Sequence, residues 1–144
     1  MKALTLSGLD RHRDLGLLLL RLGMGLMFVG HGVPKIMGGP KEWVEIGSAM
    51  GQLGIHSGWK VLGLMAGLAE AGGGVLIALG LFTRLACLPP LFTVLVALNL
   101  DYHKGRGFLG ISHAAEAAIF FVALFVMGGG RYSVDAMISG KRAG

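Results

Sequence analysis

Four long apolar runs divide the chain, and shorter segments that contain glycine, proline or charged residues separate them. The runs cover about residues 15–32, 61–82, 85–100 and 111–128. An α-helix rises about 1.5 Å per residue, so roughly 20 apolar residues cross a hydrocarbon layer about 30 Å thick. The pattern therefore predicts an all-α integral membrane four-helix bundle that forms a single domain over residues 1–144.

The composition favours a membrane protein over a soluble one. Hydrophobic residues make up 53% of the chain and charged residues 15%, with a mean hydropathy of +0.69. A soluble bundle of this composition would need four helices with almost no polar faces. The formal net charge of +5 does not indicate nucleic-acid binding, because the basic residues flank the apolar runs, where they contact lipid headgroups. Their distribution favours both termini in the cytoplasm.

The longest polar segment, residues 36–60, follows the first apolar run. Its apolar residues recur at helical spacing with charged residues among them, which predicts a short amphipathic helix at the outer membrane surface. Two tryptophans would anchor this segment at the interface, or the segment would form a lid over the helix ends. The residues concerned are Trp43, Ile46, Met50, Leu53 and Trp59.

Glycine and proline positions indicate how the helices pack and where they end. The Gly63-x-x-x-Gly67 motif and the triplet Gly72–Gly74 predict close contacts between helices in lipid. The segment Gly30–Lys35 contains Pro34 and predicts the end of the first helix, with His31 near the outer surface.

Two further residues interrupt the apolar runs. Arg21 lies about 9 Å from the inner end of the first run, and we expect its side chain to reach the headgroups in preference to a buried ion pair. Cys87 is the only cysteine, which excludes an intramolecular disulfide and predicts a packing residue.

Glu70 is the most informative polar residue, because it lies near the centre of the second apolar run. Nine residues from Val61 place it roughly 14 Å deep. A carboxylate at that depth costs several kcal/mol unless it is protonated or partnered, so it should face other helices. The other three runs must supply its partner.

The alternating direction of four spans brings further polar residues to the same outer side. His113 and Glu116 are three residues apart and share a helix face, which membrane energetics should turn inward. We therefore predict a polar pocket that opens outward, with Glu70 as its floor. Glu70 and Glu116 are the candidate catalytic residues. The candidate ligand-binding residues are His31, Lys35, Asp101, His113 and, in a short turn on the inner side, Arg84; Lys35 and Asp101 would shape the mouth of the pocket.

Three chemistries fit this predicted pocket. Paired His and Glu side chains bind quinone or quinol oxygens and pass protons. Two histidines on different helices, His31 and His113, are a weaker indication of haem ligation. A metal held by Glu116 and His113, joined by His31 or Glu70, is the third alternative. The same residues would also serve as a polar lock that holds the four helices in register.

The sequence resembles the DoxX family of small four-helix membrane proteins, over roughly residues 14–136. Five features carry the resemblance, and they occur in the expected order. They are Phe28-Val-Gly-His31-Gly-Val-Pro-Lys35, Gly67-Leu-Ala-Glu70-Ala-Gly-Gly, Gly80-Leu-Phe-Thr-Arg84-Leu, Glu116 and Gly130-Arg131-Tyr-Ser-Val-Asp135. The resemblance implies a multi-pass protein of the cytoplasmic membrane, and the family takes its name from a subunit associated with a terminal quinol oxidase.

Together these observations favour an accessory or small subunit of a quinone-linked membrane redox system. The alternatives are a non-catalytic membrane scaffold or partner protein, and a transporter of small solutes or lipids. The expected partners are the lipid bilayer and other membrane or redox subunits. Close-packing glycines also leave a homo-oligomer open.

Overall fold

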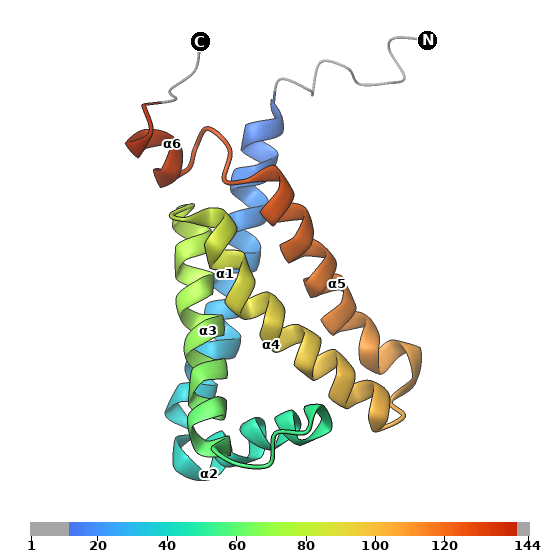
Figure 1. Ribbon diagram of the computed structural model, residues 1–144. Coiled ribbons are helices and arrows are strands. Elements are labelled where there is room, and N and C mark those ends of the chain that lie inside the picture. Colours follow the sequence, from blue (N-terminus) through green and yellow to red (C-terminus); the bar gives the residue numbers. More distant parts are fainter. Residues whose placement is uncertain (1–11, 141–144) are drawn as a thin grey trace.

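The computed structural model describes residues 12–140, which form helices joined by short turns (Figure 1). Within them, four helices are long and apolar enough to cross a membrane: α1 (Arg13–Met37), α3 (Trp59–Leu79), α4 (Thr83–His103) and α5 (Gly107–Met127). Three shorter helices are α2 (Gly39–Gly47), the 3₁₀ helix η2 (Ser48–Leu53) and α6 (Val134–Ile138). The all-α prediction with four spans is confirmed. We name the two ends of the bundle the α2 end and the α6 end.

The first span is longer than predicted. α1 does not stop in the Gly30–Lys35 segment but continues through Pro34 to Met37. Proline lacks one N–H, so it removes a single helical bond and leaves the following turn intact. The helix ends one turn later, where the Gly38 N–H donates to the Pro34 carbonyl (2.9 Å) and Gly39 adopts a φ of +78°. This added turn places Lys35 on the helix.

Close glycine contacts hold α1 against α3. A Cβ on Gly25 would lie 2.6 Å from the Gly74 carbonyl oxygen, and a Cβ on Gly32 would lie 2.6 Å from that of Gly67. Backbones can approach this closely only where side chains are absent. The prediction of close packing is confirmed for Gly67 and Gly74, whereas Gly72 meets no atom within 4 Å.

The helices α3 and α4 meet at their shared turn and diverge toward the other end of the bundle (Figure 1). Near the turn they are close, because a Cβ on Gly73 would lie 2.9 Å from the Pro90 ring. The core beside this crossing contains fully buried Phe121 and Cys87. As predicted, Cys87 is a packing residue. The wedge between the diverging helices is occupied by α2 and η2 at its wide end.

The predicted short helix after the first span is present as α2, followed by η2. Its tryptophan is not a simple interfacial anchor. The Trp43 indole N–H donates to the carbonyls of Lys35 (2.9 Å) and Ile36 (3.1 Å) in the last turn of α1. A Cβ on Gly63 of α3 would clash with the backbone of Trp43, so α2 lies directly on α3. The segment is therefore built into the α2 end of the bundle.

Candidate functional site

An ion pair with a buried carboxylate joins α1 to α3. The Lys35 Nζ lies 2.6 Å from each carboxylate oxygen of Glu70. The Glu70 side chain is 6% exposed and that of Lys35 is 30% exposed. Lys35 comes from the last turn of α1, and Glu70 from the middle of α3. The partner that Glu70 requires inside a span is thus the lysine that the sequence had placed at the mouth of the pocket.

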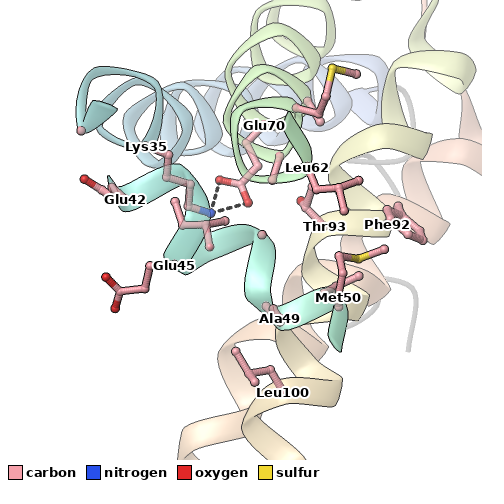
Figure 2. Close-up of a pocket in the computed structure, with 18 of the residues that line it drawn as sticks. Lys35, Glu42, Glu45, Ala49, Met50, Leu62, Glu70, Phe92, Thr93 and Leu100 are labelled. Atoms are coloured by element: carbon pink, nitrogen blue, oxygen red, sulfur yellow. Dashed lines mark hydrogen bonds and ion pairs between the residues drawn. The ribbon is translucent and has the colours of Figure 1, made fainter. Parts of the chain in front are cut away.

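This ion pair lies at one side of a cavity of about 840 Å³ between α2, η2, α3 and α4. Figure 2 shows the Lys35 ammonium directed at the Glu70 carboxylate, with side chains of α2 and α4 around the cavity. The lining residues that Figure 2 labels are Lys35, Glu42, Glu45, Ala49, Met50, Leu62, Glu70, Phe92, Thr93 and Leu100.

The cavity is amphipathic. Most of its wall is apolar, and the lining residues Met65 of α3 and Phe92 of α4 are more than half exposed. The charged rim includes Lys41 and Lys104. Next to the ion pair, the Thr93 hydroxyl donates to the Pro90 carbonyl (2.9 Å), so its oxygen remains free to accept a hydrogen bond.

The structure does not bring all the predicted site residues into this cavity. His31, His113 and Glu116 are absent from its lining. Instead the His31 and His113 rings lie edge to face with centroids 6.0 Å apart, where α1 passes α5. The sequence predicted a single pocket, but the structure has two separate polar sites: the Lys35–Glu70 cavity, and the face of α1 and α5 that carries His31, His113 and Glu116. Helical spacing placed these residues at similar depth, but only the packing decides which side of α1 and α5 they occupy.

A metal site finds no support among these residues. Within residues 12–140, no group of three or more His, Cys, Asp or Glu side chains is placed to hold a metal ion. The pairing of His31 with His113 as haem ligands remains a prediction.

Asp101 was expected to shape the mouth of the pocket, and it does not line the cavity. Its carboxylate lies 3.3 Å from the Arg106 guanidinium, across the turn between α4 and α5. Leu100 of α4 and Lys104, which follows the last residue of α4, line the cavity instead. Asp101 therefore stabilises the turn between α4 and α5 and is not part of the cavity wall.

Arg84 lies at the α6 end, remote from the Glu70 cavity. It lines a second hollow of about 610 Å³ together with Arg131 and Asp135. Its guanidinium donates weakly to the Val126 carbonyl (3.4 Å). Arg84 therefore cannot contribute to a ligand bound at the Lys35–Glu70 pair.

The α6 end is held together by Arg21, which is fully buried. Its guanidinium donates to the Tyr132 carbonyl (2.9 Å) and, at 3.5 Å, to the carbonyls of Ile77 and Ala78 at the end of α3. The side chain reaches toward the expected end of the bundle. The expectation of headgroup contact is nevertheless wrong, because backbone carbonyls of the protein replace the lipid.

Asp135 completes this end by capping α4. Its carboxylate accepts hydrogen bonds from the backbone N–H groups of Phe82 (2.7 Å) and Thr83 (2.8 Å) and from the Thr83 hydroxyl (2.9 Å). Burial tends to raise the pKa of Asp135, but these hydrogen bonds and the Arg21 charge outweigh it and lower the pKa below its ordinary value. A cap of this kind satisfies otherwise unpaired helix N–H groups.

The lowered pKa of Asp135 predicts a loss of stability in acid. Because the folded state has the lower pKa, the stabilisation is complete above the unfolded value of about 3.9 and disappears as the pH falls through the folded value. We expect the melting temperature in detergent to fall by a few degrees over this window, since a cap contributes about 1 kcal/mol. Asp135→Asn should lower the melting temperature at pH 7 and flatten the acid dependence. An unchanged acid dependence in Asp135→Asn would assign it to other carboxylates.

The fold and these contacts define a multi-pass integral protein of the cell membrane, with an ion pair between two of its spans. The chain belongs to the DoxX family, which it matches over residues 16–103. This confirms the resemblance seen in the sequence. The match contains the Lys35–Glu70 pair and nearly all of its cavity, whereas His113 and Glu116 lie beyond it.

Three relatives extend the comparison over most of the chain. The chain is 32% identical to the inner membrane protein YqjF of Escherichia coli, covering 89% of this chain and 95% of that protein. It is 30% identical to the uncharacterized membrane protein Rv3486 of Mycobacterium tuberculosis, covering 86% and 81%. It is 29% identical to an uncharacterized protein of Haemophilus influenzae, covering 84% and 86%. No solved structure matches the chain.

Proposed function

We infer that this protein binds an isoprenoid quinone or quinol in the cavity beside the Lys35–Glu70 pair, as an accessory or small subunit of a membrane redox system. The observation that carries the proposal is the position of this pair. It is the buried polar end of a cavity whose remaining wall is mostly apolar. A quinone has the same division, with two polar oxygens on a ring and a long apolar tail.

The chemistry of the pair suits a quinone head. The Lys35 ammonium has three donors, so it can keep Glu70 and still donate to a quinone carbonyl. The Glu70 carboxylate can accept a hydrogen bond from a quinol hydroxyl and take one of the two protons that the quinol releases when its two electrons pass to the redox partner subunit; the second proton passes to water. A carboxylate and an ammonium at 2.6 Å thus supply both the acceptor and the donor that the two redox states of one ligand require.

The size and the location of the cavity support the same ligand. A volume of about 840 Å³ lies in the range of about 300–1,000 Å³ typical of small-molecule sites. Exposed Met65 and Phe92 mark the side where α3 and α4 diverge toward the lipid. A tail could leave the cavity there and remain in the bilayer, so the ligand would not have to cross water.

The proposal is tested by measuring which lipids purify with the protein. We expect the organic extract of the wild-type protein to contain quinone well above its content in the surrounding membrane. Glu70→Gln keeps the side-chain shape but removes the charge, and it should lower the bound quinone by at least about tenfold, because a hydrogen bond to a charged group contributes roughly 1.5–3 kcal/mol.

Glu45→Gln is the matched control, because Glu45 lines the same cavity but is exposed and makes no ion pair within residues 12–140. It should retain most of the quinone. An extract that holds phospholipid in place of quinone would support the transporter alternative. Equal quinone in wild type and Glu70→Gln, with both proteins monodisperse, would reject the proposed site.

A further inference from the structure

Glu116 is exposed in the middle of a membrane span. It is the tenth of the 21 residues of α5, about 14 Å from the beginning of the helix. Among the described residues, no ion pair or hydrogen bond involves its carboxylate. A carboxylate that faced lipid at this depth would cost several kcal/mol. The surface around Glu116 therefore requires a cover that can hydrogen-bond to it.

Two imidazoles lie beside this carboxylate. His113 is one turn before Glu116 on the same face of α5, and His31 of α1 lies against His113, with ring centroids 6.0 Å apart. Both histidines are exposed. This face thus carries an acceptor and two groups that can donate to it, and the same three residues do not form a metal-binding group.

A row of open glycines runs along α1 and ends at Gly30, the residue before His31. Gly16, Gly23 and Gly30 recur every seven residues, and a Cβ on any of them would meet no atom within 4 Å. Gly25, which packs against α3, is two residues from Gly23 and hence about 200° around the helix. The open glycines therefore face away from α3, where the backbone of another helix could approach closely.

We propose that this face of α1 and α5 binds a second copy of the same chain, with the glycine row at the contact between the two α1 helices. Charge complementarity favours a second copy over an unrelated partner. In a twofold dimer one patch contacts itself, so Glu116 of each copy can accept a hydrogen bond from His31 or His113 of the other. Each copy then covers the exposed carboxylate of its partner. This proposal does not depend on what the Glu70 cavity binds.

Disulfide crosslinking in native membranes tests the contact directly. In a Cys87→Ser background, single cysteines replace Gly16, Gly23 and Gly30, and copper phenanthroline oxidises thiol pairs to disulfides. A disulfide requires Cα atoms about 4.4–6.8 Å apart, so only residues at the crossing of the two helices can join. We expect a covalent dimer from at least one of the three positions.

Gly72→Cys is the matched control, because Gly72 is also an exposed helical glycine with open space at its Cβ, but on α3. It should remain monomeric on oxidation. No dimer from any of the three α1 positions, or an equal amount from Gly72→Cys, would overturn the proposal.

A second measurement uses the mass of the purified protein in mild detergent. We expect a dimer for the wild type and for Gly72→Leu, and a monomer for Gly23→Leu, whose added side chain meets nothing within its own copy. Glu116→Leu should weaken the dimer about tenfold, and Glu116→Gln should retain it, because the amide oxygen still accepts a hydrogen bond. A wild-type monomer at all concentrations would contradict the inference.

Discussion

Gly32→Ala should lower the melting temperature of the purified protein by roughly 5–15 °C, because overpacking in a tight contact costs about 1–3 kcal/mol. The added methyl group would clash with the backbone nitrogen of Ala71 and lie 2.6 Å from the Gly67 carbonyl oxygen. These are backbone atoms, so no side-chain rotation relieves the clash and α1 must move away from α3. The measurement is thermal unfolding in detergent, followed by size-exclusion chromatography.

Gly72→Ala is the control for this prediction. It introduces the same methyl group into a spanning helix, at a position with no atom within 4 Å. We expect its melting temperature to stay within about 2 °C of the wild type, or to rise slightly because alanine is the better helix former. An equal fall in melting temperature in the two variants would show that Gly32 acts through helix flexibility and not through close packing.

Arg21→Met should destabilise the protein at least as much as Gly32→Ala. The change leaves an apolar chain of similar length but removes every donor from a fully buried site. The Tyr132 carbonyl would lose a charged hydrogen bond of 2.9 Å, which contributes about 1.5–3 kcal/mol, and the Ile77 and Ala78 carbonyls would lose longer contacts of 3.5 Å. We expect most of the protein to aggregate on extraction from the membrane.

Arg84→Met is the matched control, since Arg84 lies at the same end of the bundle but is exposed, with a single long contact of 3.4 Å. This variant should be extracted in normal yield. The comparison separates the effect of the buried hydrogen bonds from the general loss of a basic residue near the headgroups. Normal yield for Arg21→Met would contradict the role assigned to Arg21.

The sequence predicted the spans well because a bilayer imposes a simple requirement on length and apolarity. The details at the helix ends were harder. Pro34 was expected to end α1, yet the helix continues to Met37 because one missing hydrogen bond is cheaper than leaving several backbone groups unpaired in lipid. Because α1 was expected to end at this proline, Lys35 was expected in a loop and was not recognised as the partner of Glu70.

A usable signal for that partner was present. Phe28, Gly32 and Lys35 follow the i, i+4, i+7 spacing of one helix face, and the structure turns this face toward α3 and the core. No such signal separated Glu116 from Glu70. The runs are apolar on all sides, so the pattern states the depth of a polar residue in the membrane but not its direction around the helix. That direction depends on which glycines contact which helix.

The two ends of the bundle differ in how firmly the helices are joined. At the α6 end, hydrogen bonds of Arg21 and Asp135 join three parts of the chain: the end of α3, the start of α4 and the segment after α5. At the α2 end, α3 and α4 stand apart (Figure 1). Both helices line the cavity there. The hydrogen-bonded α6 end therefore joins the helices more firmly than the α2 end does. A ligand that entered the proposed site from the α2 end would therefore leave the hydrogen bonds of Arg21 and Asp135 at the α6 end unbroken.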